Sequence, residues 1–229
     1  MKRTLMIFAL VFTTCALLSS CGKKATESTS TEGSEVFPNS VGFQWTYEVY
    51  DDLLEATDTV TLTITDTLTL TNARYAAVWV YAWADTVDTQ YVAVVDDTVS
   101  IYPTRDTSFL AAMYIFPLEV GTSWTYRHRL GNATSTVVET GSFSVHSGTY
   151  QDCFRIDTEI RGIAFDDFSS CSIWFAAKTG VLWIHLYEEF NYSLLTAQTW
   201  ELIDLVSPSP VTKNVSAHPF SLVQPCRRN

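Results

Sequence analysis

The sequence lacks the motifs by which most enzymes and nucleotide-binding proteins are recognised. It contains no Gly-x-Ser-x-Gly nucleophile elbow, no phosphate-binding loop and no Gly-x-Gly-x-x-Gly turn. Its four histidines have neither the paired spacing nor the Cys-x-x-Cys partner of a zinc site; they are His128, His146, His185 and His218. The sequence therefore predicts a protein that is not an enzyme, with no cofactor and no metal site.

The sequence also lacks an apolar run long enough to cross a bilayer, which takes about 20 residues. Its one candidate extends from Leu5 to Leu18, follows a short basic start, and ends in Leu-Ser-Ser-Cys at Cys21. These features resemble a bacterial lipoprotein signal peptide, whose cysteine is diacylated and becomes the mature N-terminus. The resemblance implies a signal peptide over residues 1–20 and lipidation at Cys21. An ordinary secretory signal is the alternative.

The anchor that this resemblance implies tethers the protein to a membrane without spanning it. Each buried methylene contributes about 0.8 kcal/mol to membrane binding. Two acyl chains therefore give stable anchoring, whereas a single chain binds only marginally. In the Gram-negative lipoproteins that the chain resembles, an aspartate after the cysteine indicates retention at the inner membrane. Gly22 stands there instead, so the resemblance implies the outer membrane. Residues 21–36 are polar and rich in Ser, Thr and Glu, so they are expected to form a flexible tether.

Basic residues are scarce. The formal net charge is −11, and all 25 acidic residues lie between Glu27 and Asp204, against seven basic ones, which leaves about −18 in that region. Nucleic acid and anionic lipid surfaces are therefore poor partners for the folded part. Solubility alone is also a sufficient explanation of an acidic surface of this kind.

A repeat organises the rest of the chain. The segment FPNSVGFQWTY, residues 37–47, returns 79 residues later as FPLEVGTSWTY, residues 116–126, with identical residues at seven of eleven positions. In each copy, proline precedes the strand because it cannot donate a ladder hydrogen bond, and glycine supplies a tight or left-handed turn. The Trp and Tyr rings, two residues apart, share one strand face. The sequence thus predicts two β repeats, 37–115 and 116–206.

Alternation supports strands elsewhere. Between Thr59 and Thr71 apolar residues alternate with Thr until Asp66, which marks either a turn between two strands or a bulge. We expect about five strands in each copy, an added closing strand over 194–206, and no helix of ten residues outside the signal peptide. The fold class is all-β, an antiparallel meander that forms an open or half barrel or two packed units. Residues 207–229 contain four of the seven prolines and are expected to be a loosely ordered tail.

Cysteine spacing suggests one disulfide. Cys153 and Cys171 are symmetric about Gly162, so a hairpin that turns at this glycine places them opposite each other. An exported protein meets an oxidising environment, which favours a Cys153–Cys171 bond over two buried thiols. Cys226 remains unpaired.

The repeat and the signal together resemble a set of exported bacterial lipoproteins of unknown function. Their marks are a Phe-Pro-Leu-x-x-Gly-x-x-Trp-x-Tyr start, here residues 116–126, and a later Trp-Phe/Tyr-Ala-x-x-x-Gly-Val-Leu segment, here residues 174–182. The first copy has Asp96-Asp97-Thr98 in place of the glycine turn. The resemblance implies an antiparallel β architecture like that of lipoprotein carriers, and no catalytic residues.

These observations favour a binding or structural role at the cell envelope. The aromatic residues that either form the core or face an apolar ligand are Trp45, Trp79, Trp83, Trp124, Trp174 and Trp183. A carbohydrate- or protein-binding surface, for which an envelope protein is one partner, is the alternative and requires exposed Trp rings. A hydrolase is a third reading that requires two carboxylates in one cleft. Acidic doublets do not supply them, because neighbours on a strand point to opposite faces.

Overall fold

The computed structural model describes residues 36–162, 168–190 and 193–208, all within one compact unit. The predicted signal peptide, Cys21, the tether and nearly all of the tail lie outside these residues. The described chain forms twelve strands: β1 (Gln44–Asp51), β2 (Ala56–Thr69), β3 (Tyr75–Ala82), β4 (Val87–Val95), β5 (Thr98–Tyr102), β6 (Ala112–Ile115), β7 (Ser123–His128), β8 (Gly131–Val145), β9 (Gly148–Gly162), β10 (Phe168–Ala176), β11 (Gly180–Phe190) and β12 (Ser193–Val206).

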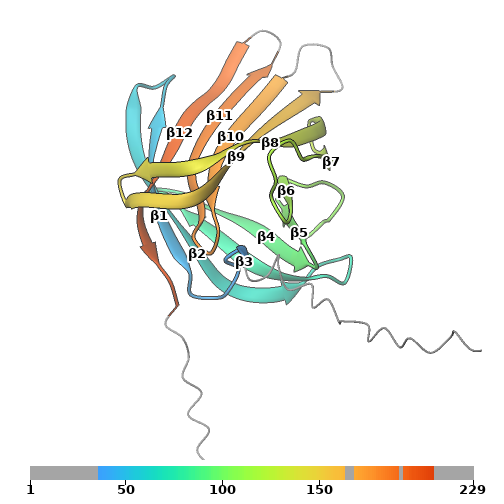
Figure 1. Cartoon of the computed structure of the whole chain (residues 1–229). Helices are drawn as coiled ribbons and strands as arrows, with labels where there is room; N and C mark the ends of the chain where they lie inside the picture. The colour runs from blue at the N-terminus through green and yellow to red at the C-terminus, as the bar shows by residue number, and fades with distance from the viewer. Residues whose placement is uncertain (1–35, 163–167, 191–192, 209–229) are drawn as a thin grey trace, which may run out of the picture. The chain divides into compact units, whose positions relative to one another are not determined.

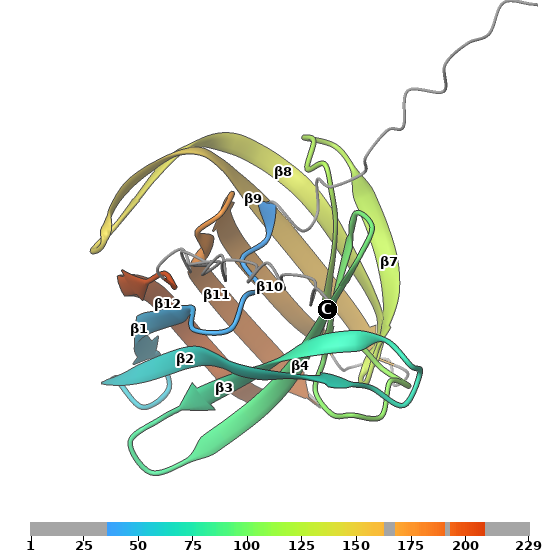
Figure 2. The same cartoon turned by 90° about the horizontal axis from the view of Figure 1, so that it is seen from below.

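All twelve strands belong to one antiparallel sheet that curves around a shared interior (Figures 1 and 2). Its order is β6-β5-β4-β3-β2-β1-β12-β11-β10-β9-β8-β7, so each half is an unbroken meander of six strands. The all-β, antiparallel fold class predicted from the sequence is therefore confirmed. The expected count of five strands per copy is wrong for the first copy, because the four residues of β6 are too few to show a period.

The paired seam between the copies joins β1 to β12. Its register runs from Gln44 opposite Val206 to Asp51 opposite Gln198, with one irregularity after Thr46. This seam makes the two meanders one continuous sheet.

The bridged seam lies at the opposite side of the sheet, between β6 and β7, and these strands form no ladder. The Leu110 amide donates to the Arg127 carbonyl oxygen at 2.9 Å. The Trp124 indole N–H donates to the Met113 carbonyl oxygen at 2.7 Å. Among the described residues, the hydrogen bonds across this seam are thus one backbone bond, from Leu110 just before β6, and one indole bond.

The repeated motif has the same geometry in both copies. Gly42 and Gly121 have φ of +95° and +92°, as the predicted left-handed turn requires. The Gly42 amide donates to the Ile64 carbonyl at 2.9 Å, and the Gly121 amide donates to the Val137 carbonyl at 2.8 Å. A bulge follows both acceptors, immediately before Asp66 and Glu139 respectively. Asp66 therefore marks a bulge in one long strand, not a turn between two.

Each motif docks on the other copy. The Lys178 amide in the β10–β11 turn donates to the Val36 carbonyl at 2.7 Å, and the Phe116 amide donates to the Asp97 carbonyl in the β4–β5 turn at 2.8 Å. The Phe37 and Phe116 rings meet edge to face with centroids 6.4 Å apart. Both rings are buried, so the two motifs supply the centre of a core that the copies share.

The structure contradicts the predicted disulfide. Phe168 pairs with Arg161, and Cys171 therefore lies opposite Thr158 rather than Cys153. Thr158 is five residues from Cys153 along β9, about 16 Å at 3.3 Å per residue. Both thiols are free.

The physical reason for this error is the role of Gly162. This glycine pairs with Gly131 at the end of β9 instead of forming the turn. A Cβ on Gly131 would lie 3.2 Å from the Gly162 Cα and 2.0 Å from the Arg161 carbonyl oxygen. Glycine at position 131 therefore permits a close backbone approach between β8 and β9.

Candidate functional site

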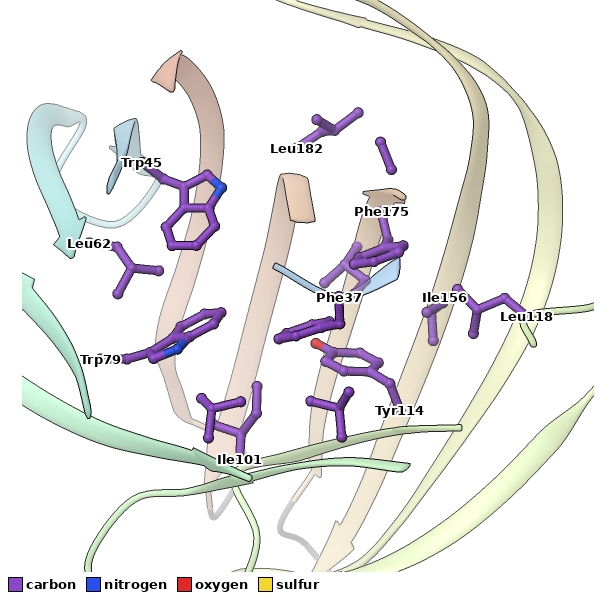
Figure 3. Close-up of a cluster of buried hydrophobic side chains, with 14 of the residues drawn as sticks. Phe37, Trp45, Leu62, Trp79, Ile101, Tyr114, Leu118, Ile156, Phe175 and Leu182 are labelled. Carbon is purple, nitrogen blue, oxygen red and sulfur yellow. The ribbon is translucent and has the colours of Figure 1, made fainter. Parts of the chain in front are cut away.

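A central cavity of about 240 Å³ lies inside the curved sheet and receives side chains from both copies. Figure 3 shows the neighbouring cluster, with Phe37 between Trp79 on one side and Phe175 and Tyr114 on the other. The lining residues of the central cavity are Phe37, Trp45, Tyr47, Leu62, Trp79, Tyr81, Gln90, Ile101, Ala111, Ala112, Tyr114, Cys171, Ile173, Gly180, Val181, Ile184, Leu186 and Trp200.

Polar atoms around the central cavity are largely occupied within the protein. The Tyr47 hydroxyl donates to the Val181 carbonyl at 2.8 Å. The Tyr81 hydroxyl donates to Gln90 Oε1 at 3.1 Å. The Trp45 indole donates to the Thr179 carbonyl at 2.6 Å. With these groups satisfied, the wall offers mainly aromatic and aliphatic surface, which suits an apolar occupant.

Titratable groups in this wall remain neutral near pH 7. Burial raises the pKa of Tyr47, Tyr81 and Tyr114 above the usual value for tyrosine. Burial, with smaller contributions from Asp157 and Glu188, raises the pKa of the Cys171 thiol to about 12. Cys171 is therefore protonated and a poor nucleophile, because the thiolate is the reactive form.

The six tryptophans predicted as ligand-facing or core residues separate into two groups. Trp45 and Trp79 line the central cavity and stack with centroids 5.3 Å apart. Trp83 packs edge to face on Trp200 at 5.2 Å. Trp124 is buried at the bridged seam.

The other two, Trp174 and Trp183, are cross-strand partners on β10 and β11. Trp174 points away from the cavity side of β10, since its neighbour Ile173 lines the cavity. The β8–β9 hairpin reaches across to β12, where the Ser147 amide donates to the Leu202 carbonyl at 3.2 Å (Figure 1). Phe143 of this hairpin stacks on Trp174 at 4.5 Å. All seven tryptophans are buried or half-buried, so no exposed Trp platform supports a carbohydrate-binding surface.

Sequence reasoning missed several cavity residues. Trp200 lies on the closing strand β12, which the repeat does not predict to face the cavity. Tyr114 lies on the short strand β6, which gave no periodic signal. Phe37 was available in the repeated motif, but its position at the contact between the copies depends on the sheet order.

Two further pockets of similar size lie near the β7–β8 turn and the start of β10. The rim pocket, about 210 Å³, is lined by Arg129, Leu130, Ile160, Phe168, Ser169, Glu188, Glu189 and Leu195. The arginine pocket, about 260 Å³, is lined by Phe109, Arg127, His128, Arg129, Gly131, Asn132, Arg161 and Gly162.

In the described parts of the chain, the carboxylates of Glu188 and Glu189 share the rim pocket, and none lines the central cavity. Among the same described residues, no group of three or more His, Cys, Asp or Glu side chains is placed to hold a metal ion. The Asp51 carboxylate accepts from the Gln198 side chain and from the Leu54 and Leu53 amides, which lowers its pKa and gives it a local role at the end of β1. Asp166-Asp167 lies outside the described residues.

The chain was compared with known proteins. No protein-family profile matches it, and no curated protein does. Among solved structures, it is similar to a protein described as exported, with a YmcC-like fold, from Bacteroides fragilis: TM-score 0.46, 15% identity, covering 75% of this chain and 99% of that one. It is also similar to a protein described as a lipoprotein from Parabacteroides distasonis: TM-score 0.44, 14% identity, covering 74% and 97%. Likeness at this level assigns neither family nor function.

Among the residues that the structure describes, no helix is both long enough and apolar enough to cross a membrane.

Proposed function

We propose that this chain is a lipid-anchored protein of the cell envelope, at the outer membrane, that binds an apolar ligand in its central cavity and performs no catalysis. The observation that carries the proposal is the cavity itself, about 240 Å³ and walled by aromatic and aliphatic side chains from both copies. The Leu-Ser-Ser-Cys sequence at residues 18–21, which resembles the acylation signal of lipoproteins, supports the lipid anchor.

Binding rather than catalysis is favoured by the chemistry of the wall. The lining residues of the central cavity include no carboxylate and no histidine. Its one thiol, Cys171, is held protonated because burial raises its pKa to about 12. A surface role for an envelope protein partner remains the alternative; it predicts no cavity occupant.

Ala112 offers a direct test. This residue is half-buried on β6 and lines the cavity, so Ala112→Phe fills part of the space without adding a polar group. The processed chain from residue 21, with Cys21→Ser to prevent acylation, is titrated with dodecanol while the fluorescence of the cavity tryptophans is recorded. We expect a dissociation constant on the order of micromolar, because about ten buried methylenes at 0.8 kcal/mol each exceed the cost of association.

The matched control is Ala82→Phe, which places the same ring at an exposed position on β3. Ala112→Phe should weaken binding at least about tenfold, equivalent to 1.4 kcal/mol, whereas Ala82→Phe should leave it unchanged. Equal binding by all three proteins would place dodecanol elsewhere and contradict the proposal.

A further inference from the structure

The few basic side chains of the folded part are unevenly distributed. Between residues 36 and 208 the chain has seven Arg and Lys residues. Three of them, Arg127, Arg129 and Arg161, line the arginine pocket. A strongly acidic domain thus concentrates nearly half of its cations at one site.

The sheet register brings these arginines together. Arg127 on β7 and Arg161 on β9 both lie opposite Asn132 on β8, so all three side chains share one face. Neighbouring strands are about 4.8 Å apart, which places the two arginine backbones about 10 Å apart across β8. Arg129 lies in the intervening β7–β8 turn. Glycine at position 131 allows the close approach of the strands, because a Cβ there would lie 2.0 Å from the Arg161 carbonyl oxygen.

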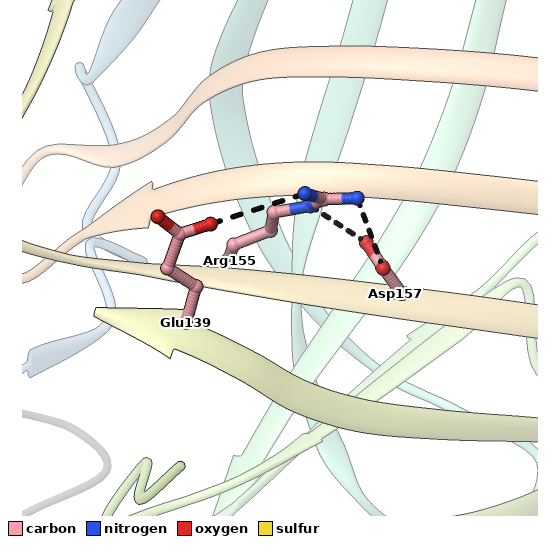
Figure 4. A network of polar contacts seen from close by, with 3 residues as sticks. All are labelled: Glu139, Arg155 and Asp157. Atoms are coloured by element: carbon pink, nitrogen blue, oxygen red, sulfur yellow. Dashed lines mark hydrogen bonds and ion pairs between the residues drawn. The ribbon is translucent and has the colours of Figure 1, made fainter. Parts of the chain in front are cut away.

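Two of these guanidinium groups have no carboxylate partner among the residues that the structure describes. Within the described chain, no Asp or Glu oxygen lies within 4.0 Å of Arg127 or Arg129, and Arg161 has one exposed partner, Glu159, at 3.5 Å. Arg155, by contrast, is held by Asp157 at 3.1 Å and by Glu139 at 3.9 Å (Figure 4). Contact with the described acidic residues therefore leaves positive charge in the arginine pocket.

His128 adds hydrogen-bonding capacity rather than charge. Its Nδ1 accepts from the Leu130 amide at 3.3 Å. Burial and the neighbouring Arg129 both lower its pKa, which keeps the ring neutral near pH 7. The arginines alone supply the positive charge.

The adjoining rim pocket connects this charge to apolar surface. The two pockets share Arg129. Ser169 in the rim pocket is 1% exposed, and its Oγ has no hydrogen-bond partner among the described residues. Cys171, two residues further along the same face of β10, lines the central cavity. Residues that line the rim pocket and the central cavity are therefore about 7 Å apart along this strand.

We propose that the arginine pocket binds the oxyanion headgroup, a phosphate or a carboxylate, of an amphiphile whose linker lies in the rim pocket and whose hydrocarbon part extends along β10 into the central cavity. This inference rests on the apolar-ligand function proposed above. The arginines bind the anion, and Ser169 donates to an oxygen of the linker.

Glu188 and Glu189 define where the anion lies. Both contribute to the rim pocket. Glu189 accepts from the Tyr187 hydroxyl at 3.1 Å, and Glu188 accepts weakly from the Thr196 hydroxyl at 3.5 Å. Their negative charge repels an anion toward Arg129, so removing one of these charges should tighten binding.

The test compares three probes on the processed Cys21→Ser chain: dodecanol, dodecyl phosphate below its micelle-forming concentration, and inorganic phosphate. We expect dodecyl phosphate to bind at least about tenfold more tightly than dodecanol at low salt, and this preference to shrink as salt screens the charges. The triple variant Arg127→Gln, Arg129→Gln, Arg161→Gln should lose the preference and still bind dodecanol. Glu188→Gln should increase the affinity for dodecyl phosphate a fewfold.

The control is Arg105→Gln, which removes an exposed arginine that lies over the Tyr91 ring at 5.9 Å, outside both pockets. An unchanged preference in the triple variant overturns the inference. Inorganic phosphate binding as tightly as dodecyl phosphate overturns the headgroup assignment in favour of a free-anion site. Failure of dodecanol to bind counts against the proposed function, whereas loss of the headgroup preference alone counts only against the inference.

Discussion

The two seams between the copies are built from equivalent strands, yet β1 and β12 pair along all eight residues of β1, whereas β6 and β7 form no ladder. The difference follows from strand length. β12 has 14 residues and β6 has four, although each is the sixth strand of its copy. Duplication of the motif therefore explains the common core, but the extension of one strand decides which seam is closed.

Both seams use the tryptophan of the repeated motif, in different surroundings. Trp45 is 1% exposed at the paired seam and stacks on Phe43 at 5.4 Å and on Trp79 at 5.3 Å. Trp124, at the bridged seam, is 6% exposed and stacks on no aromatic ring in the described chain. Trp45→Ala should destabilise the fold by about 4–5 kcal/mol and Trp124→Ala by about 3 kcal/mol, because aromatic pairs add about 0.5–1.5 kcal/mol to simple burial. Urea unfolding of the two variants measures the difference, and an equal or reversed order would contradict it.

Glycine substitutions test the same difference between the paired and bridged seams, with a smaller expected loss of stability. Gly180 has φ of +97°, and an added Cβ would lie 3.3 Å from Pro38 Cγ and 3.4 Å from Trp45 Nε1, next to the paired seam. Gly121, in the turn that precedes β7 at the bridged seam, has φ of +92° and open space around it. Gly180→Ala should cost about 2 kcal/mol and Gly121→Ala about 1 kcal/mol, the latter from backbone strain alone. Matched thermal melts would show the expected difference, and a larger loss for Gly121→Ala would argue against a tightly packed paired seam.

The bridged seam should open more readily than the paired one. Leu110→Pro removes the amide that bonds the Arg127 carbonyl, whereas Leu110→Ala keeps it. Since β6 and Cys171 both line the central cavity, opening there exposes this thiol. In the processed chain with Cys21→Ser, Cys153→Ala and Cys226→Ala, maleimide labelling of Cys171 should be about fivefold faster in Leu110→Pro than in Leu110→Ala. This factor corresponds to about 1 kcal/mol for one hydrogen bond.

The pH dependence of this labelling identifies the residue. The thiolate reacts, and burial raises the pKa of Cys171 to about 12, so the rate should rise about tenfold per pH unit between pH 7 and pH 9. A plateau near the ordinary thiol pKa of about 8.5 would mean that Cys171 is already in water. Equal rates for Leu110→Pro and Leu110→Ala would show that this bond does not hold the seam.

Local pattern was sufficient to predict the strands and the motif. Alternation around Thr59–Thr71 indicated β2, and the glycines at 42 and 121 indicated left-handed turns that the structure shows. The pairing register between strands could not be predicted from local sequence pattern. Gly162 looked like a hairpin centre but serves the approach of β8, which is why the Cys153–Cys171 bond is wrong.

The sequence predicted the aromatic, apolar character of the candidate site but not most of its residues. Two of the six proposed tryptophans line the cavity, because alternation gives a shared face within a strand but does not say which strands face each other across the interior. The arginine pocket has no signal in the sequence, since Arg127 and Arg161 are far apart in the chain and meet only through Asn132. Net charge pointed away from an anion site because a sum over the domain hides a local cluster.

Native mass spectrometry of the processed Cys21→Ser chain, purified without detergent, tests the central claim most directly. Binding of an apolar ligand in the central cavity predicts a reproducible additional mass that organic solvent removes, and that is reduced in Ala112→Phe and retained in Ala82→Phe. A bare protein mass in all three, with no mass gained on adding dodecyl phosphate, would contradict the account and leave the cavity as part of the core.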